Sequence, residues 1–340
     1  MKILVDAMGS DHYPQPDVEG AVQAAREYGV EIVLVGNKDL VEPELAKYSL
    51  AGLHISTLHA SQIIEMQEHP AVAVKSKKDS SMVVGMQMLK RGEVDAFVSA
   101  GNSGGVLAAA LLYLGRVKGV KRPALSSVFP TRKGFCLLLD LGANADCKPE
   151  YLLQFAVMGS IYTERVLGRT HPRVAIVSNG EEEGKGSQLV QQAYPLLKAS
   201  GLNFVGNAEG KDVPAGLADV IVTDGFTGNV IAKLAEGVSA FLLDILKEEI
   251  KARPLATVGA ALAQGAFAQV KRRLDYREYG GAPLLGVDGV VIVAHGRSDS
   301  LAMKNAIRVA RQAVTEGALS AMRAGIAQSL ALTQSIDTEE

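Results

Sequence analysis

A glycine-rich turn, Gly101-Asn102-Ser103-Gly104-Gly105, precedes an apolar helical pattern over residues 106–114 and is the strongest candidate for binding an anion. The first turn of a helix offers free N–H donors and the positive end of the helix dipole. Glycine also lets an anion approach the backbone closely. Gly101, Asn102, Ser103 and Gly104 are therefore candidate phosphate-binding residues. An equally good alternative is that Asn102 is an ordinary N-cap and Ser103 merely opens the helix.

A second turn, Thr227-Gly228-Asn229, stands before a long helical pattern that starts at Val230. Its N–H groups can point toward the same anion, and the Asn229 amide can polarise a carbonyl. Asp224, three residues earlier, can orient a partner. The alternative is structural, with Asp224 capping the turn and Asn229 packing at the start of the helix.

Lys185 lies in a third polar segment, Asn179-Gly180-Glu181-Glu182-Glu183-Gly184-Lys185-Gly186-Ser187. The glycine-to-lysine spacing is one residue short of a Walker A loop, and no Ser or Thr follows the lysine directly. A G-x-G-x-x-G turn after a strand is also lacking, so the sequence predicts no nucleotide cofactor. Lys185 can reach a phosphate as a flexible point charge, or it can be a solvated lysine beside three glutamates.

Other residues with reactive side chains give weaker signals. Cys147 stands at the expected start of a helix over 149–159, where a thiol can become a nucleophile, although a packed cysteine is the commoner case. His295 follows an apolar run and is either a proton donor or a histidine satisfied at a strand end. The histidines are scattered without a metal-like pair, so we expect no metal.

Short apolar runs alternate with helical patterns along the chain, and they must position these turns. Runs of this kind predict buried strands, at residues 2–5, 31–35, 96–99, 135–139, 174–177, 220–222 and 290–293. Strands that are apolar on both faces and separated by helices indicate an α/β protein with a mostly parallel sheet. Ligands then bind at the carboxyl ends of the strands.

Five of these strands run into polar turns that carry glycine, which converge on one crevice if the strands are parallel. The turns begin at Asp6, Ser99, Asp140, Ser178 and Thr223. The chain contains no repeat and no long linker. We therefore expect a single two-lobed domain over 1–332, with a frayed polar tail over 333–340.

The composition limits the class of protein. The chain has 340 residues, with 35 Lys and Arg against 37 Asp and Glu, so its formal net charge of −2 disfavours nucleic acid as a partner. Only Cys136 and Cys147 are present, which fits a reducing compartment. The first residues lack the pattern of a signal peptide, and the sequence predicts a cytoplasmic protein.

A surface for a membrane or a second subunit is expected over residues 230–273, which predict a protruding helical hairpin. Beyond Arg253-Pro254, an apolar stripe on one helical face is followed at once by three cations. Its members are Leu255, Val258, Leu262, Ala266 and Val270, and the cations are Lys271, Arg272 and Arg273. Such a stripe can rest on an anionic membrane. A dimer interface or packing within the chain explains the same pattern equally well.

Read together, these turns resemble the PlsX family of acyl-acyl carrier protein:phosphate acyltransferases over roughly nine-tenths of the chain. The matching segments span residues 5–12, 77–82, 99–104, 140–144, 152–159, 224–229, 279–286 and 294–298. Ser10, Asn144 and His295 lie in them and join the candidate substrate-binding residues. The family usually has glycine where Ser10 stands and Asn-Thr-Gly-Ala over 102–105, but a hydroxyl group is kept at 103.

The resemblance implies an isocitrate/isopropylmalate dehydrogenase-like α/β/α fold and a homodimer without a cofactor. Its implied substrates are inorganic phosphate and a fatty acyl thioester of acyl carrier protein. The acyl phosphate product would feed phospholipid synthesis through a membrane glycerol-3-phosphate acyltransferase. The resemblance also gives Lys185 and Asn229 importance in the reaction.

A direct transfer of the acyl group from the thioester to phosphate, without an acyl-enzyme, fits these residues. Phosphate needs no strong base, so the protein has to hold it against the thioester carbonyl and stabilise the oxyanion. We expect residues 101–104 with Thr227 and Gly228 to hold phosphate, and Lys185 and Asn229 to neutralise the intermediate. The rival functions are an acyl-coenzyme A:phosphate transacylase of the same fold, a dehydrogenase, and a non-catalytic membrane scaffold.

Overall fold

Eleven strands form one mixed sheet in the computed structural model, which describes residues 1–337 apart from the side chains of residues 271, 276 and 330–337. The strand order is β3-β2-β1-β4-β11-β10-β5-β6-β9-β7-β8. The strands are β1 (Lys2–Asp6), β2 (Glu31–Gly36), β3 (Ile55–His59), β4 (Ala96–Ser99), β5 (Ala124–Thr131), β6 (Gly134–Leu139), β7 (Val174–Val177), β8 (Phe204–Ala208), β9 (Val220–Val222), β10 (Ala282–Leu285) and β11 (Val291–Val293).

The sheet consists of two parallel halves that run in opposite directions. Strands β3, β2, β1, β4 and β11 are parallel to one another and form the first half-sheet. Strands β6, β9, β7 and β8 form the second half-sheet. Between them, β10 and β5 are each antiparallel to both neighbours, so the direction reverses across the pair. The predicted mostly parallel sheet is confirmed, with this reversal added.

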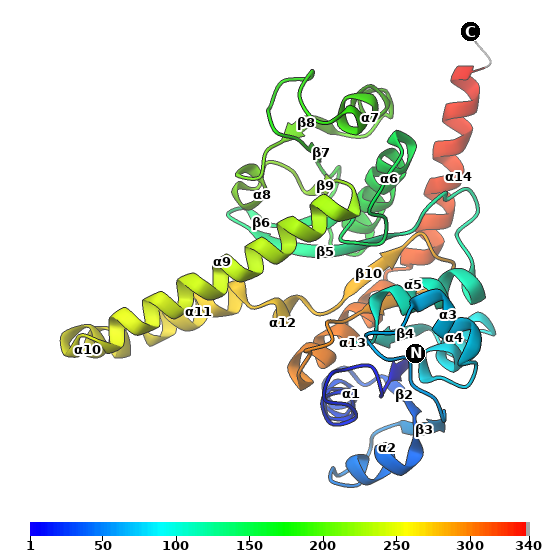
Figure 1. Ribbon diagram of the computed structural model, residues 1–340, viewed down its shortest axis with the longest axis vertical. Helices are drawn as coiled ribbons and strands as arrows, with labels where there is room; N and C mark the ends of the chain where they lie inside the picture. Colours follow the sequence, from blue (N-terminus) through cyan, green and yellow to red (C-terminus); the bar gives the residue numbers. More distant parts are fainter. Residues whose placement is uncertain (338–340) are drawn as a thin grey trace.

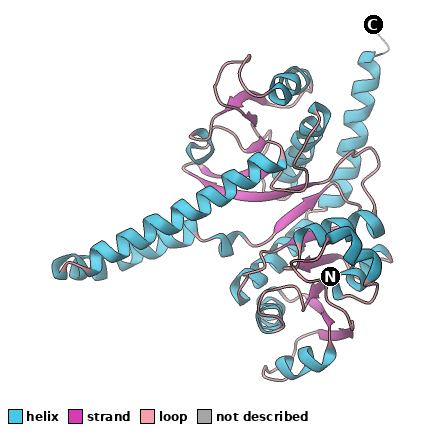
Figure 2. Cartoon of the chain, in the orientation of Figure 1, coloured by secondary structure: helices cyan, strands magenta, loops and turns pink. Residues whose placement is uncertain are grey.

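Helices cover both faces of each half-sheet (Figures 1 and 2). Helices α1 (Gln15–Tyr28), α2 (Lys38–Leu45) and α13 (Ser300–Thr315) share a core on one face of the first half-sheet. On its other face lie α3 (Pro70–Ser76), α4 (Ser81–Lys90), α5 (Ser103–Ala109) and the π-helical turn η1 (Ala110–Leu114). The second half-sheet is covered by α6 (Pro149–Arg165), α7 (Gln188–Ala199) and α14 (Ala318–Asp337) on one face. Helix α8 (Asp212–Ala215) and the start of α9 (Gly225–Lys251) cover the other.

This layering explains why the strands are apolar without alternation. In β1, Ile3 and Val5 enter the core on one face, whereas Leu4 enters the core on the opposite face. In β6, Leu137 and Leu139 face one core and Leu138 faces the other. A strand between two helical layers has no face for water, so both sets of side chains are apolar.

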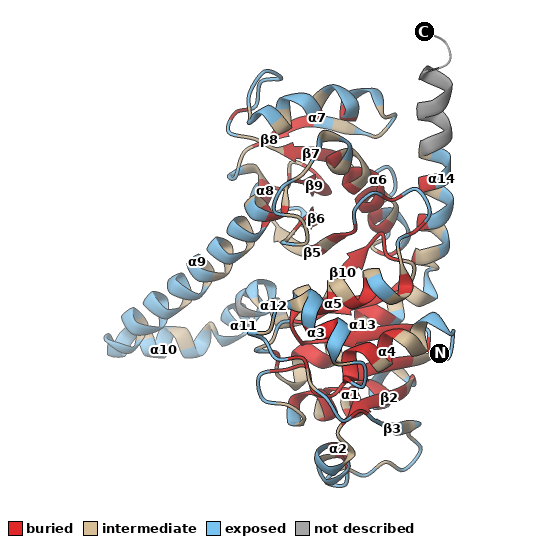
Figure 3. Cartoon of the chain, turned by 45° about the vertical axis from the view of Figure 1, so that its right-hand side comes forward, coloured by how far each residue is buried: buried red, intermediate tan, exposed pale blue. Residues whose placement is uncertain are grey.

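A helical hairpin projects away from both lobes (Figures 1 and 3). It consists of α9, α10 (Pro254–Leu262) and α11 (Gln264–Leu274), and the short α12 (Tyr276–Tyr279) leads back to β10. The helix breaks at Ala263, so the predicted stripe is divided, with Leu255, Val258 and Leu262 on α10. Leu255 and Leu262 are 88% and 87% exposed. Of the cations beyond the stripe, Arg272 lies within 3.5 Å of Glu278, and the side chain of Lys271 is outside the described part.

Several predicted helix boundaries differ from the structure. The helix expected over 149–159 continues to Arg165, and the helix expected over 106–114 begins at Ser103 and becomes π-helical at Ala110. Helix α9 begins at Gly225 rather than at Val230, because Asp224 supplies a cap six residues before the apolar pattern starts. Helix α14 continues to Asp337, so the described part of the predicted tail is helical, and residues 338–340 lie outside the described part of the chain. Among the described residues, no helix combines the length and the apolar character needed to cross a bilayer.

Candidate active site

The turns after β1 and β4 pack directly against each other. A Cβ atom added at Gly9 would lie 2.7 Å from the backbone nitrogen of Gly101, so only glycine permits this approach. The buried carboxylate of Asp6 accepts hydrogen bonds from the Ser99 hydroxyl at 2.7 Å and from the Met8 N–H at 3.1 Å. Since β1 and β4 are parallel neighbours, their carboxyl ends bring these two turns together.

Asn102 is the N-cap of α5, as the structural alternative held. Its side-chain oxygen accepts from the Gly105 N–H at 3.1 Å. Its amide nitrogen donates to the backbone carbonyls of Glu65, Met66 and Glu68 at 3.1–3.3 Å. Both polar groups of the Asn102 side chain are therefore already used in hydrogen bonds within the chain. The N–H groups of Ser103 and Gly104 have no hydrogen-bond partner among the described residues, so they are the donors that this turn can offer to an anion.

Ser10 is buried and faces the first turn of α1 rather than an open surface. Its hydroxyl donates to Asp17 Oδ2 at 2.6 Å, and Asp17 Oδ1 has no hydrogen-bond partner among the described residues. Burial raises the pKa of Asp17 to about 8, helped by the nearby charge of Asp6 and opposed by the Ser10 hydrogen bond. The predicted role of Ser10 in substrate binding stays a prediction.

Asp140 organises the turn after β6. Its two carboxylate oxygens accept five hydrogen bonds, from the backbone N–H groups of Leu125, Gly142, Ala143 and Asn144 and from the Asn144 side chain. Burial raises the pKa of this carboxyl, and the hydrogen bonds from Asn144 and Ala143 oppose that shift. The Asn144 amide also donates to the Pro123 carbonyl at 2.8 Å, so its position is fixed.

The start of α9 packs against this turn. The Gly225 N–H donates to the Asn144 carbonyl at 2.7 Å, and a Cβ atom at Gly228 would lie 1.9 Å from the Asp140 carbonyl oxygen. Asp224 caps the helix by accepting from the Thr227 N–H and hydroxyl, both at 2.8 Å. The Gly228 N–H donates to the Asp224 carbonyl.

These contacts give Thr227 and Gly228 structural roles, because their N–H groups are already used within the helix. Their predicted part in phosphate binding stays a prediction. Asn229, by contrast, is exposed, and its side chain has no hydrogen-bond partner in the described chain. The Asn229 amide is thus the group of this turn that is free to meet a substrate.

Two of the three glutamates beside Lys185 are paired with other lysines. Glu181 pairs with Lys211 at 3.2 Å, and Glu183 pairs with Lys198 at 3.0 Å. The Glu182 carbonyl accepts from the Asn207 side chain at 2.7 Å. Lys185 itself is exposed, and within the described chain no carboxylate lies within ion-pair distance of its ammonium group. The loop therefore presents an unneutralised cation, although no described contact joins Lys185 to Asn229.

His295 links the two lobes. The Lys233 ammonium, two turns into α9, lies 2.9 Å from His295 Nε2, and Arg297 pairs with Glu236 of the same helix at 3.0 Å. Burial, followed by the charges of Lys233 and Arg297, lowers the pKa of His295. Because an ammonium group only donates, His295 Nε2 accepts. The neutral imidazole is favoured at neutral pH, which weakens the predicted proton-donor role.

Cys147 is a packed thiol and not an activated one. Burial, followed by the charges of Asp140 and Asp224, raises its pKa to about 12. Its sulfur donates to the Asn144 carbonyl at 3.6 Å. A thiol of this pKa is protonated at neutral pH, which disfavours the nucleophile alternative for Cys147.

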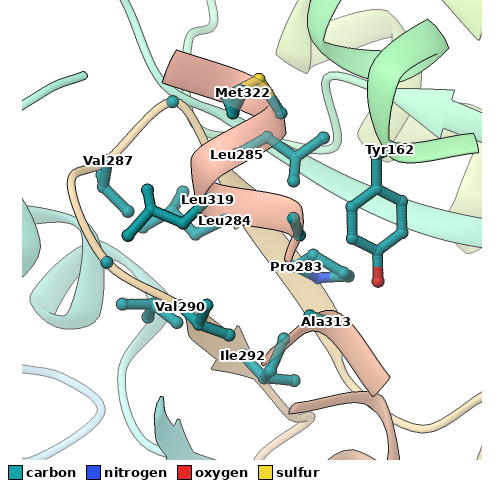
Figure 4. A pocket seen from close by; sticks show the side chains of 14 residues that line it. Tyr162, Pro283, Leu284, Leu285, Val287, Val290, Ile292, Ala313, Leu319 and Met322 are labelled. Atoms are coloured by element: carbon teal, nitrogen blue, oxygen red, sulfur yellow. The ribbon is translucent and has the colours of Figure 1, made fainter. Parts of the chain in front are cut away.

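Two further features lie outside this constellation. Glu181, Glu209 and Asp212 lie close enough to hold a metal ion, but the Lys211 ammonium already pairs with the first two. A cavity of about 30 Å³ lies beneath α14, and Figure 4 shows the Tyr162 ring beside its apolar walls. It has room for about two water molecules and is too small for an acyl chain.

The structure thus gathers the predicted residues in two groups. One contains the turns at Ser10 and at 101–104, and the other contains Asn144 and the start of α9, beside the Lys185 loop. The sequence interpretation missed Lys233, which connects the second group to His295, and the organising role of Asp140. Asp140 directly follows a buried strand, which is a detectable signal. The Lys233 contact spans 62 positions and has no local signal.

Comparisons with known proteins agree with this architecture. The profile of a family described as "Fatty acid synthesis protein" matches residues 1–321. The phosphate acyltransferase of Pelotomaculum thermopropionicum is 51% identical over 326 residues, which cover 96% of this chain and 95% of that protein. The phosphate acyltransferase of Elusimicrobium minutum is 48% identical over 341 residues and covers both chains fully.

Solved structures of other proteins are similar to this chain in fold. A phosphotransacetylase from Streptococcus pyogenes has a TM-score of 0.62 at 16% identity and covers 93% of this chain and 94% of its own. A branched-chain phosphotransacylase from Enterococcus faecalis has a TM-score of 0.60 at 12% identity, covering 92% of this chain and 99% of its own. At these identities the similarity confirms the α/β/α fold that the resemblance implied. The near-full-length identity of about half shows that the chain belongs to the phosphate acyltransferase family of fatty acid synthesis proteins.

Proposed function

We propose that this acyltransferase moves a fatty acyl group from the thioester of acyl carrier protein onto inorganic phosphate, giving an acyl phosphate and the free carrier thiol. The observation that carries the proposal is the character of the site. Within the part of the chain that the structure describes, it offers unpartnered N–H groups at Ser103 and Gly104, the free Asn229 amide and the unneutralised Lys185, beside a Cys147 thiol that stays protonated. Donors and one cation suit a reaction between an anion and a carbonyl.

In this reaction a phosphate oxygen attacks the thioester carbonyl carbon and forms a C–O bond. The electron pair of the carbonyl moves to its oxygen, which the Lys185 ammonium and the Asn229 amide stabilise. The intermediate then collapses, the C–S bond breaks, and the thiolate leaves with the electron pair and takes a proton from water. Phosphate is held by the N–H groups of Ser103 and Gly104, so no acyl-enzyme is needed.

The proposed roles are tested with Asn229→Ala and Lys185→Met. Loss of one donor to an oxyanion typically lowers kcat by about 100- to 1000-fold. Acyl phosphate is trapped with hydroxylamine and counted as hydroxamate. Asn203→Ala is the control, because the exposed amide of Asn203 donates to the backbone carbonyl of His171, outside the candidate site. Near-normal turnover by Asn229→Ala would remove that residue from the mechanism.

An acyl-coenzyme A:phosphate transacylase is the alternative, since phosphotransacylases share this fold. The two functions differ in the group that carries the thioester. We expect kcat/KM to be higher for the thioester of acyl carrier protein than for the coenzyme A thioester of the same acyl chain. The reverse preference would establish the alternative.

We further propose that the hairpin serves both dimer formation and membrane contact. Large apolar side chains are exposed along α9 at intervals of three and four residues, including Val230, Leu234, Val238, Phe241 and Ile245. A second copy of the chain would cover this stripe. The α10 tip, where Leu255, Val258 and Leu262 are exposed, would then rest on an anionic membrane and bring acyl phosphate to a membrane glycerol-3-phosphate acyltransferase.

The membrane proposal is tested by flotation with liposomes that contain anionic lipid. Leu255→Glu with Val258→Glu should abolish flotation, because both side chains would have to enter the interface. The control is Leu40→Glu with Val205→Glu, which places the same charges on exposed apolar positions of α2 and β8. Flotation that survives the first pair would refute the membrane surface, and size-exclusion chromatography reports the dimer separately.

A further inference from the structure

A basic loop connects η1 to β5, over residues 115–123, and it differs from the rest of this weakly acidic chain. Arg116, Lys118, Lys121 and Arg122 are all exposed and stand within seven positions. In the described chain none of the four pairs with a carboxylate, and no acidic residue stands between them in the sequence. The nearby acid Asp288 is already paired with Arg323 at 2.7 Å. The loop therefore carries four unneutralised positive charges.

The backbone of this loop is fixed in place. The Lys121 N–H donates to Gln154 Oε1 at 2.8 Å, and Gln154 in turn donates to the Gly119 carbonyl at 2.9 Å. The Val117 N–H donates to the Gly286 carbonyl, and Arg116 forms a β-bridge with Val287. A partner that binds here finds the charges already positioned and loses little entropy in ordering the loop.

A surface pocket of about 580 Å³ opens among these charges. Its walls are Leu111, Arg116, Lys121, Arg122, Pro123 and Tyr151. The Arg122 guanidinium lies 5.9 Å from the centre of the Tyr151 ring, which holds this cation at the wall of the pocket. The pocket is thus a wide depression lined by three cations.

The loop borders the candidate active site. It ends at Pro123, whose carbonyl accepts the hydrogen bond from the Asn144 amide at 2.8 Å. Leu125, two residues further on, donates its N–H to Asp140. A partner held by the basic loop would therefore sit next to the turn at 140–144 and the start of α9.

We propose that residues 116–122 dock the acidic face of a protein, and that this protein is the carrier of the acyl thioester. The inference rests on the proposed function for the identity of the partner. Charge complementarity supports a protein, because the four cations are spread along an exposed rim, as in interfaces that steer association. Small-molecule sites are typically more concave and more apolar than this wide depression, half of whose lining residues are cations.

The test compares two double variants. One combines Lys121→Gln and Arg122→Gln, and the control combines Arg132→Gln and Lys133→Gln. The two double variants remove the same charges from opposite ends of strand β5, since 132 and 133 form the turn between β5 and β6, about 25 Å away. Steady-state rates are measured with acyl carrier protein thioester, with the coenzyme A thioester and with the small neutral N-acetylcysteamine thioester. Binding of acyl carrier protein is measured in parallel by calorimetry.

For the first variant we expect KM for acyl carrier protein thioester to rise about 2- to 30-fold with kcat unchanged, since exposed pairs contribute roughly 0.2–1 kcal/mol each. Its kcat/KM should also depend less on salt. The control variant and all rates with the N-acetylcysteamine thioester should match wild type. Equal KM values for the two variants would overturn the proposal, and so would a defect confined to coenzyme A thioester. A wild-type enzyme that binds the carrier at this loop but makes no acyl phosphate would instead refute the proposed function.

Discussion

The contact between the start of α9 and the Asp140 turn predicts a graded response to one substitution, glycine to alanine. A Cβ atom at Gly228 would lie 1.9 Å from the Asp140 carbonyl oxygen, and one at Gly225 would lie 2.7 Å from the Asn144 carbonyl oxygen. Carbon and oxygen normally approach no closer than about 3.3 Å. Alanine at 228 therefore forces a displacement of about 1.4 Å, and alanine at 225 forces about 0.6 Å. Gly237 lies further along the same helix with nothing within 4 Å of the added atom.

The displacement moves Asn229, because it is the next residue of the helix. A misplacement of about 1 Å in a catalytic group typically lowers the rate by about 100-fold. We expect kcat/KM to fall by at least this factor in Gly228→Ala and by less in Gly225→Ala. Overpacking should also destabilise Gly228→Ala by about 1–3 kcal/mol. Gly237→Ala should keep full activity and gain up to about 1 kcal/mol from helix propensity.

The assay is hydroxamate trapping of acyl phosphate, with circular dichroism and thermal unfolding to show that each variant is folded. Gly225→Ala keeps the test informative if Gly228→Ala does not fold. We expect activity to be highest in Gly237→Ala, lower in Gly225→Ala and lowest in Gly228→Ala. A folded Gly228→Ala enzyme with wild-type kcat/KM would show that the position of α9 against the Asp140 turn does not matter for catalysis.

Three further predictions follow from the titratable groups. The pKa of Asp17 is about 8 in the folded chain against 3.8 ordinarily, so its contribution to stability is lost as the pH rises from about 4 to 8. Asp17→Asn cannot ionise, and by chemical denaturation its stability relative to wild type should rise by up to about 4 kcal/mol as the pH is raised from 5 to 8. A pH-independent difference would mean that Asp17 is not buried as described. Cys147→Ala should retain full activity, since the thiol pKa of about 12 excludes a nucleophile at neutral pH. Lys233→Met should raise the pKa of His295, seen in its NMR titration, and an unchanged titration would contradict the contact between them.

The parallel strands were predictable because burial on both faces leaves a continuous apolar run. All seven predicted strands are present within one or two residues of their expected ends. The four that the pattern missed are the edge strands β3 and β8 and the antiparallel pair β5 and β10. Edge strands carry polar residues because one side meets water. Strands β5 and β10 each contain a proline, Pro130 and Pro283, which weakens a strand signal.

The candidate site was predictable as a set of turns but not as a set of available groups. The sequence shows glycine and asparagine directly after buried strands, so the presence of a polar turn can be predicted from neighbouring residues alone. Whether the Asn102 amide is free depends on carbonyls at 65, 66 and 68, more than thirty residues away. Whether Lys185 is neutralised depends in part on Lys198 and Lys211, which form ion pairs with two of its three glutamate neighbours, Glu183 and Glu181. Such contacts form only when distant elements pack.

The antiparallel pair in the middle of the sheet decides how the two groups of turns can serve one reaction. Taken alone, the reversal at β10 and β5 would put the carboxyl ends of the two half-sheets at opposite edges. Sheets twist by roughly 20–25° per strand, so the four steps from β11 to β9 rotate the strand direction by about 80–100°. The two sets of carboxyl ends are then about a right angle apart rather than opposed. Helix α9 closes the remaining gap, because it starts at the end of β9 and places Lys233 on His295, beyond the end of β11. The single crevice predicted from parallel strands is therefore replaced by two groups of turns that a twisted sheet and one long helix bring to the same region.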